Sequence, residues 1–473
     1  MKVLVYTRPR TSAFFQSLCE STKIFTDVKY FSDAPRAPKD HIQLMQRYYH
    51  FKRRIVDGHH VDWSLWDSLD FADIHSRCRY LRQLSPAEAG LRIKAMSSTI
   101  HALISEYDPD YILGLVMDSY PQDIAHRLMK QRGGAYIGLL NNMLNGYSRI
   151  TTYGELLTQR EVSQDEIDRA LQQLSDAAYV PSMQRDFMWS THPARMFFTK
   201  YLKEKAKSVY YWTWRNIMRD PDNFYANTVG HESCMSCHKI DQLFYRRFED
   251  KDYQVQIATA KASGKTIVYL PLQFYPECSL DYWIAAPQMR NFYDVMDRIC
   301  ALKPDDYLIV VKEHPSASGL RKSRFYRKLK KAPHILIAPF DELSNNVIEQ
   351  ADVVLTWTGS VGIEAAVREK PLISFGGVYF DPGKRFPTLE TFDDVMNLGK
   401  FVKRARNVQA EIDLSALKRD VIAYLLSGLV KGYIFVLDYG SSKNPVAQDR
   451  MSILALSLSN SLTEFTCEAK QVR

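Results

Sequence analysis

The strongest constraint on the fold is a repeated pattern of short apolar runs, each followed by a stretch with helical periodicity. From residue 265 onward these runs are rich in β-branched residues and bounded by turn residues, as buried parallel strands are. Helical stretches separate the runs, so this region predicts a parallel sheet covered by helices. The predicted strands are Thr266–Leu270, Tyr307–Lys312, Ile335–Ile337, Val353–Thr356 and Leu372–Ser374.

The first part of the chain repeats the same α/β pattern. Its predicted strands are Lys2–Thr7, Lys23–Val28, Tyr111–Val116 and Ala135–Leu140. The middle of the chain is rich in Gln, Arg, Tyr and Met, has no clear strand and is predicted to be helical. A chain of 473 residues is also too long for one ordinary core. We therefore predict two Rossmann-like domains joined by a helical middle segment.

The predicted boundaries divide the chain into four consecutive parts. Residues 1–156 form the first Rossmann-like domain and residues 157–255 the helical segment. Residues 256–410 form the second Rossmann-like domain, and residues 411–473 are C-terminal helices that pack back on the N-terminal side.

Charge and cysteine content limit the classes of function. The net charge is +8, and a basic run over residues 321–331 predicts either a solvated helix face or a surface for phosphates or an anionic membrane. No nucleic-acid-binding motif accompanies that run, so we expect no nucleic-acid partner. The N-terminus shows no signal peptide, and the seven cysteines do not form a disulfide framework. The expected location is the cytoplasm, with peripheral contact with the inner membrane through the 321–331 helix.

A polar motif, Lys312-Glu313-His314-Pro315, lies at the end of a predicted strand. Ligands of open α/β sheets bind beyond the carboxyl ends of the strands. Lys312 and His314 can both donate to a phosphate there, and Pro315 fixes the turn after them. The motif predicts a phosphate contact.

A second loop, from Thr356 to Glu364, follows another predicted strand and opens a helix. Gly359 allows a ligand to approach the backbone, and Thr358 and Ser360 supply hydroxyls where unpaired N–H groups attract anions. Glu364 lies one turn into that helix and is predicted to accept from a ribose hydroxyl. The alternative is an ordinary Thr/Ser helix cap. Two such loops on neighbouring strands favour phosphate binding.

Three motifs occur in one order: Pro271-Leu-Gln-Phe-Tyr-Pro-Glu277, Lys-Glu-His-Pro and Thr-Gly-Ser-Val-Gly-Ile-Glu-Ala. In this order they resemble the bacterial capsular polysaccharide synthesis family, which includes the β-Kdo transferases. The resemblance implies a GT-B fold and a CMP-activated ulosonic acid such as Kdo as the donor. It also implies that His314 and Ser360 hold the donor phosphate and that Gln273 and Glu277 lie near the donor.

The N-terminal half departs from the pattern of that family. Its members tend to carry a Glu-x-Gly-x-x-Arg-like element, but here Leu144 stands where the carboxylate is expected, although Arg149 is present. The transfer still requires a proton acceptor or a nucleophile. We predict Asp118 for this role, with a helix cap as the alternative. Acceptor contacts are assigned to Arg8, Arg10 and Arg149, with a solvated loop as the alternative for Arg8 and Arg10.

Two further patterns suggest metals. The segment His231-Glu-Ser-Cys234-Met-Ser-Cys237-His238 contains Cys-x-x-Cys-His and offers four zinc ligands, but free thiols are the favoured interpretation. Two Asp-Pro-Asp triplets, at residues 108–110 and 220–222, mimic a metal-binding Asp-x-Asp but are predicted to mark turns or helix starts. We therefore predict no metal and no cofactor beyond the nucleotide-sugar donor.

Together these features predict a metal-independent glycosyltransferase that moves a CMP-linked sugar onto a surface polysaccharide or lipid-linked glycan. Catalytic roles fall to Asp118 and His314. One alternative is a transferase that uses a UDP- or GDP-hexose or CDP-glycerol. A second alternative is a non-catalytic scaffold of a capsule assembly complex. The predicted donor-binding residues are Lys312, His314, Thr358, Gly359, Ser360, Glu364, Gln273 and Glu277.

Overall fold

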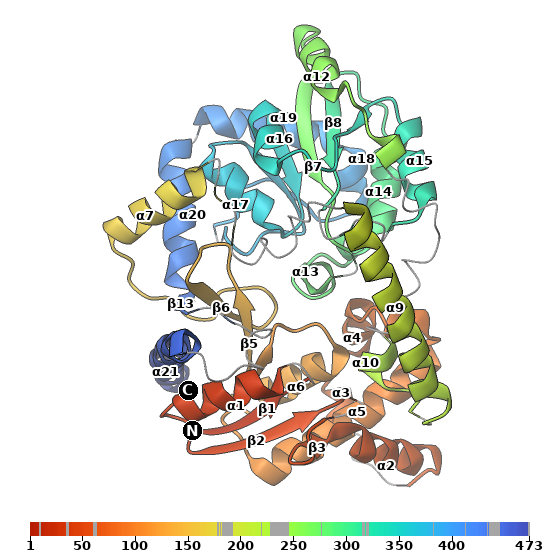
Figure 1. The fold of residues 1–473 in the computed structure, drawn as a ribbon, viewed down its shortest axis with the longest axis vertical. Coiled ribbons are helices and arrows are strands. Elements are labelled where there is room, and N and C mark those ends of the chain that lie inside the picture. Colours follow the sequence, from red (N-terminus) through yellow and green to blue (C-terminus); the bar gives the residue numbers. More distant parts are fainter. Residues whose placement is uncertain are drawn as a thin grey trace. The chain divides into compact units, whose positions relative to one another are not determined.

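The computed structural model divides the chain into two compact units, each built around its own sheet (Figure 1). Unit 1 comprises Met1–Arg160, Lys207–His231 and Gly428–Arg473, and unit 2 comprises Glu161–Ala206 and Glu232–Ser427. The structure describes residues 1–8, 11–34, 37–59, 64–176, 179, 181, 193–218, 220–227, 246–275, 277–314, 317, 321–381, 383–411, 413–432, 434 and 445–471.

Unit 1 contains a sheet of seven strands in the order β13-β6-β5-β4-β1-β2-β3. The five strands from β5 to β3 are parallel, whereas β6 pairs antiparallel with both β5 and β13. The strands are β1 (Lys2–Tyr6), β2 (Asp27–Ser32), β3 (Ile42–Gln43), β4 (Tyr111–Leu115), β5 (Ala135–Asn141), β6 (Tyr147–Thr151) and β13 (Leu429–Lys431).

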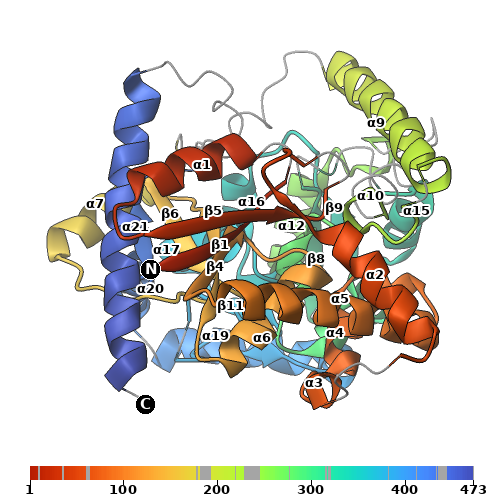
Figure 2. The same cartoon turned by 90° about the horizontal axis from the view of Figure 1, so that it is seen from below.

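Helices cover both faces of this sheet. On one face α1 (Ser12–Ser21) and α21 (Pro445–Gln471) lie side by side, and their apolar residues share a core with Val5 and Ile137 (Figure 2). On the other face α6 (Tyr120–Gln131) packs on β4 and β5. The other helices that lie wholly in unit 1 include α2 (Leu44–Val56) and α5 (Pro86–Tyr107) and the shorter α3 (Ser64–Asp67), α4 (Phe71–Arg77) and α10 (Phe224–Asn227).

Unit 2 contains a sheet of six parallel strands in the order β12-β11-β10-β7-β8-β9. The strands are β7 (Thr266–Pro271), β8 (Tyr307–Lys312), β9 (Ile335–Ile337), β10 (Val353–Thr356), β11 (Leu372–Phe375) and β12 (Thr388–Leu389).

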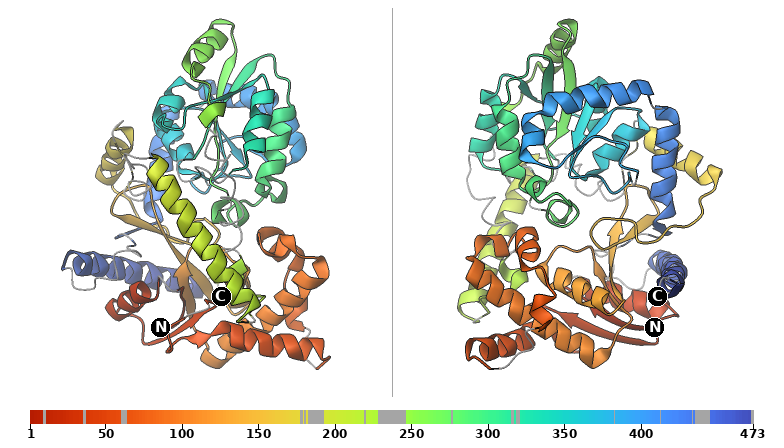
Figure 3. Two further views of the ribbon diagram at one scale, coloured as in Figure 1. Left: turned by 45° about the vertical axis from the view of Figure 1, so that its right-hand side comes forward. Right: turned by 180° about the vertical axis from the view of Figure 1, so that it is seen from behind.

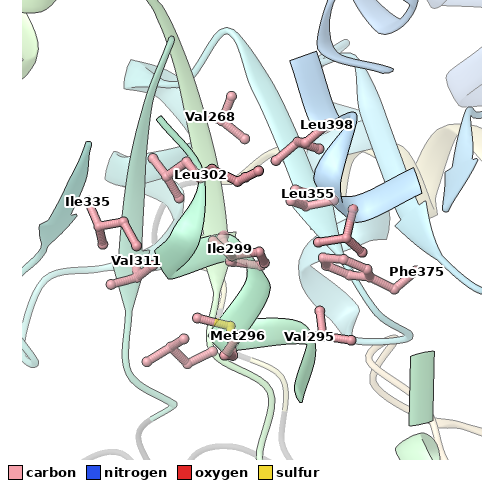
Figure 4. Close-up of a cluster of buried hydrophobic side chains, with 14 of the residues drawn as sticks. Val268, Val295, Met296, Ile299, Leu302, Val311, Ile335, Leu355, Phe375 and Leu398 are labelled. Atoms are coloured by element: carbon pink, nitrogen blue, oxygen red, sulfur yellow. The ribbon is translucent and has the colours of Figure 1, made fainter. Parts of the chain in front are cut away.

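One face of the unit 2 sheet carries a large apolar core (Figure 4). Val311, Leu355 and Phe375 point from the strands toward Ile299 and Leu398, and the members of this core are buried. The helices on this side are α14 (Phe292–Ala301), α15 (Ser323–Lys331), α18 (Phe392–Met396) and α19 (Leu398–Glu411). The other helices of this unit include α7 (Gln164–Ser175), α12 (Tyr253–Ala262), α13 (Cys278–Asp281), α16 (Ser344–Gln350), α17 (Ser360–Val367) and α20 (Leu414–Ser427).

The two Rossmann-like sheets of the GT-B-like prediction are thus confirmed, but one predicted strand is wrong. The run Lys23–Val28 was predicted as a strand, whereas β2 begins at Asp27. Ile24 and Phe25 are apolar because they pack on the core from a turn, in which the N–H of Phe25 donates to the carbonyl of Thr22. The first four residues of β2 alternate between exposed and half-buried positions, and only the last two are buried, so the apolar pattern of this strand is weaker.

The chain passes between the units more often than the four consecutive predicted segments imply. The middle segment is helical where it is described, but its helices are shared, and α9 (Pro193–Asn216) crosses from one unit to the other after Ala206. Of the C-terminal part, α20 packs in unit 2, and β13 and α21 complete unit 1. None of the described helices is both long and apolar enough to span a lipid bilayer.

Candidate functional site

In unit 2 the carboxyl end of β7 lies between those of β10 and β8, because β7 pairs in parallel with both strands. The two predicted phosphate loops, after β8 and after β10, are therefore separated by β7, and the expectation that they follow neighbouring strands is wrong. From β7 the chain builds β8 and β9 on one side and then β10, β11 and β12 on the other. The order therefore reverses between β7 and β10, and open α/β sheets bind ligands outside the strand ends at such a point. We call this region the strand-end site. It contains Gln273, Glu277, Ser279, Lys312, Glu313, His314, Thr358, Gly359, Ser360, Glu364 and Arg321.

The side chain of Trp357 fixes the position of the loop after β10. Its fully buried ring stacks on Phe375 with 4.1 Å between centroids, and its Nε1 donates to the carbonyl of Met289 at 3.0 Å. Gly359 is the N-cap of α17, and Ser360 is the first residue of that helix. The first N–H groups of a helix have no intrahelical acceptor, so this loop presents donors suited to an anion.

The segment after β7 reaches the same loop through a brace of side chains. Gln273 donates from Nε2 to Oε2 of Glu277 and to Oγ of Ser279, both at 2.9 Å, and Ser279 donates to Oε2 of Glu277 at 2.6 Å. The hydroxyl of Thr358 donates to the carbonyl of Ser279 at 3.4 Å. A Cβ placed on Gly359 would lie only 3.4 Å from Oε1 of Gln273. The two predicted motifs are thus brought into contact.

Lys312 is the last residue of β8, and its side chain is only 3% exposed. Its Nζ donates to the carbonyl of Glu313 at 3.3 Å. Burial lowers the pKa of this ammonium, and the charges of Glu313, Glu342 and Glu364 oppose the shift. Burial also raises the pKa of Glu364, against a hydrogen bond with Ser360. A phosphate bound nearby would favour the charged form of Lys312.

Glu313 has an inward role that the sequence did not indicate. Its Oε2 accepts from Nε of Arg321 at 2.7 Å and from the hydroxyl of Tyr326 at 2.5 Å. Oε1 accepts from the N–H of His314 at 2.7 Å. Arg321 also donates from Nη2 to the carbonyl of Gln273, so this one guanidinium ties the loop after β7 to the loop after β8.

The basic run that contains Arg321 is not a uniformly solvated face. Arg321 is 1% exposed and lies over the ring of Phe292, 4.5 Å from its centroid. In α15 the side chains of Phe325 and Leu329 enter the core, while Lys328 and Lys330 form ion pairs with acidic residues of unit 2. The solvated-face interpretation is wrong at Arg321, because that side chain braces the strand-end site.

His314 completes the predicted donor set and is exposed, with its ring centroid 5.4 Å from that of Phe274. The structure therefore places Lys312 at the end of β8 and the other predicted donor residues on the loops and in the first turns of the helices that follow β7, β8 and β10. Ser279 and Arg321 were missed by the sequence reasoning. Ser279 lies only two residues after Glu277, and no local signal separated Arg321 from its basic neighbours.

The carboxyl edge of the unit 1 sheet carries ionic side chains. Arg8 follows β1 and Asp118 follows the neighbouring strand β4. Nη1 and Nη2 of Arg8 donate to the two oxygens of Asp118 at 2.7 and 2.6 Å. Asp33, which follows β2, accepts from the hydroxyl of Tyr6 at 2.6 Å, and burial raises the pKa of both groups. Neither Tyr6 nor Asp33 was predicted.

Asp118 does not cap α6, since Ser119 holds the N-cap position. The N–H of Asp118 donates to Oε1 of Gln122 at 3.1 Å, which fixes the backbone beside the carboxylate.

Arg149, the third residue predicted to contact the acceptor, lies on β6 and is 1% exposed. Arg10 lies outside the described residues, as do Pro315 and the segment from His231 to His238. Among the described residues, no three His, Cys, Asp or Glu side chains form a group that could hold a metal ion.

Residues 188–383 match the sequence model of a family described as "Capsule polysaccharide biosynthesis protein". No curated protein matches the chain. The β-Kdo 2,7-transferase KpsC of Thermosulfurimonas dismutans is similar in structure, with 12% identity, 93% and 94% of the two chains covered and a TM-score of 0.36. A UDP-GlcNAc 2-epimerase of Neisseria meningitidis shows 9% identity, 90% and 99% coverage and a TM-score of 0.26. A glycosyltransferase of Rickettsia africae shows 10% identity, 95% and 98% coverage and a TM-score of 0.28.

The family match confirms the resemblance that the three ordered motifs predict, over the segment in which they lie. The class that the fold and the match define is thus an α/β protein with two Rossmann-like sheets, in which residues 188–383 are similar to capsule polysaccharide biosynthesis proteins.

Proposed function

We propose that the protein transfers a sugar from a CMP-linked ulosonic acid, such as Kdo, to a surface polysaccharide or lipid-linked glycan. The observation that carries the proposal is the convergence of Gln273, Lys312 and the Thr358–Ser360 loop at the ends of three neighbouring strands. The confirmed family resemblance favours a sugar nucleotide over other phosphate ligands.

In this proposal the start of α17 binds the donor phosphate through backbone N–H groups and the hydroxyls of Thr358 and Ser360. Lys312 and His314 offset the negative charge that grows on the leaving phosphate as the glycosidic bond breaks. Glu364 accepts from a ribose hydroxyl. The proposal assigns charge neutralisation to these cationic groups rather than to a divalent metal.

On the acceptor side we assign the proton acceptor to Asp118 of unit 1. General-base transfer requires an oxygen that the acceptor hydroxyl can reach. The side chain of Asp118 is 31% exposed, and the bidentate contact from Arg8 sets its orientation. Arg8 and Arg10 are proposed to meet an anionic group of the acceptor, and Arg149 retains its assignment as an acceptor contact. The expected cytoplasmic location is part of the same proposal.

A thermal-shift panel of CMP, CDP, UDP and GDP tests the donor. We expect CMP to raise the melting temperature, because the base and the single phosphate of the product would occupy the strand-end site. A rise with UDP or GDP alone would point to a hexose donor, and a rise with CDP but not CMP to a polyol-phosphate transferase. No rise with any nucleotide, together with no donor turnover, would favour the scaffold.

The His314→Ala variant tests the chemistry. Loss of a donor to developing charge is expected to slow sugar transfer by about 100-fold or more. His101→Ala is the matched control, since His101 is also an exposed histidine and lies on α5. Transfer at the wild-type rate by His314→Ala would remove this residue from the mechanism.

A further inference from the structure

Helix α9 and the two residues after it, Ile217 and Met218, present an unusual run of apolar side chains to solvent. Of the thirteen large hydrophobic side chains exposed in the described chain, six lie between Leu202 and Met218. Val209 is 67% exposed and Trp212 is 54% exposed. We call this set the α9 stripe. Its members are Leu202, Val209, Tyr210, Trp212, Ile217 and Met218.

The spacing places most of these residues along one side of the helix, drawn in yellow-green in Figure 3. Leu202 and Val209 are separated by seven residues, and Trp212 follows three residues later, so all three face the same direction. Tyr211 is buried and lies on the opposite side. The helix therefore packs with one side and leaves the α9 stripe uncovered by the described part of unit 1.

A buried ionic cluster holds the C-terminal end of α9 in place. Asp222 accepts from Nη2 of Arg92 at 2.8 Å and pairs with Lys52, so it joins this segment to α5 and α2. Asp220 accepts from Nε1 of Trp214 at 3.1 Å. The second Asp-Pro-Asp triplet thus anchors α9, and its carboxylates are engaged by protein donors. Among the described residues, the anchored part of α9 thus has Tyr211 buried and Val209 and Trp212 exposed.

Charge indicates what this surface contacts. Residues 193–218 contain six Lys or Arg (Arg195, Lys200, Lys203, Lys205, Lys207, Arg215) and one acidic residue, Glu204, a balance of 6 − 1 = +5. Lys205, Lys207 and Arg215 are half-buried along the same part of the helix. An exposed row of Trp, Tyr and aliphatic side chains with flanking cations is the composition of a helix that lies in the interface of a membrane.

The comparison with α15 supports the choice of α9. The predicted membrane contact lay on the basic 321–331 run, but the apolar side chains of α15 are used in the core of unit 2. Helix α15 therefore offers charge without an apolar face, whereas α9 offers both.

We propose that the α9 stripe seats in the outer layer of a bilayer that contains anionic lipid, with the helix axis along the membrane plane. The apolar and aromatic side chains enter the boundary between headgroups and acyl chains, and the lysines contact the lipid phosphates. The contact rests on surface chemistry alone and does not depend on the proposed transferase activity.

Co-sedimentation of the full chain with vesicles tests the proposal. We expect binding to phosphatidylglycerol-containing vesicles, weaker binding to pure phosphatidylcholine, and a loss with added salt of about fivefold for each engaged cation. The double variant Val209→Ser/Trp212→Ser should lower the partition coefficient by at least about tenfold. The matched control is Ile453→Ser/Leu456→Ser, which removes two exposed apolar side chains from α21.

If nucleotides raise the melting temperature of the α9 variant as much as that of the wild type, the variant is folded. If nucleotides do not raise the melting temperature of the wild type, only the proposed function is affected, and the membrane proposal is still tested by vesicle binding. Equal vesicle binding by the α9 variant and the control would overturn the proposal. So would concentration-dependent self-association of the wild type that the α9 substitutions abolish without any vesicle binding, because a second copy of the chain would then be the occupant.

Discussion

Both units have a sheet of parallel strands, to which unit 1 adds two antiparallel strands, but the charged pairs at the carboxyl edges of the two sheets differ. In unit 2 Glu313 and Arg321 are 3% and 1% exposed and connect one loop to another. In unit 1 Arg8 and Asp118 are 16% and 31% exposed. A pair that is removed from water fixes the shape of a site, whereas a pair that water reaches can exchange partners with a ligand. We infer that the unit 2 edge is preorganised and that the unit 1 edge is where charged groups meet substrate.

The Asp118→Asn substitution should have the largest effect. The amide keeps the volume but cannot accept a proton, so transfer should slow by about 100- to 10,000-fold. Steady-state rates with saturating donor and acceptor measure this. Arg8→Lys, which retains the cation but loses the bidentate geometry, should cost less. If Asp118→Asn retained more than a tenth of the rate, the unit 1 edge would not supply the base.

The second test compares the two charged pairs as structural elements. Arg321→Met leaves Glu313 buried without its cation, and breaking such a pair costs about 3–5 kcal/mol. Arg8→Met removes the cation from a pair that water already reaches at Asp118, so it should cost less than Arg321→Met. Urea unfolding followed separately for each unit by site-specific fluorescence measures both. Similar losses for the two variants would contradict the distinction between a brace and an exchangeable pair.

A smaller effect is expected on the stability of unit 1 at low pH. Burial, aided by Lys130 and Arg127, lowers the pKa of His126 in unit 1 to about 4. Because this folded-state pKa lies below the ordinary value of about 6.5, the stabilisation is present above pH 6.5 and is lost as the pH falls toward 4. As the pH falls from 7 to about 4, the free energy of unfolding of unit 1 should therefore decrease by roughly 2–3 kcal/mol less in the His126→Gln variant than in the wild type. Melting temperatures measured from pH 7 to about 4 test this, with His101→Gln as a control substitution at an exposed histidine of unit 1.

Features that short contiguous segments determine, such as buried strands and the loops after them, could be predicted from the sequence. The strands Tyr307–Lys312, Ile335–Ile337 and Val353–Thr356 have the predicted bounds, because buried parallel strands are apolar on both faces. The strand-end site was predictable for a related reason. Its loops follow those strands directly, so identifying a strand also places the polar residues at its end.

What escaped prediction depends on residues far apart in the chain. The antiparallel pairing of β6 with β13 joins segments more than 280 residues apart, as the bond from Ser148 to the carbonyl of Gly432 shows. Arg8 reaches Asp118 across 110 residues. Arg321 looked like one of several cations in a basic run, and only the tertiary packing turns it inward. Local patterns contain no signal for such partners.

The interleaved course of the chain has a consequence for biosynthesis. The edge strand β13 and the helix α21 that cover the unit 1 sheet belong to the last part of the chain, after Gly428. During translation the apolar face of the first sheet is therefore covered only after the segment beyond Gly428 has left the ribosome, whereas the residues of unit 2 are all synthesised before that segment. Phe14, Phe15 and Leu18 of α1 share a core with residues of α21. We expect an N-terminal fragment made alone to expose these side chains and therefore to bind chaperones.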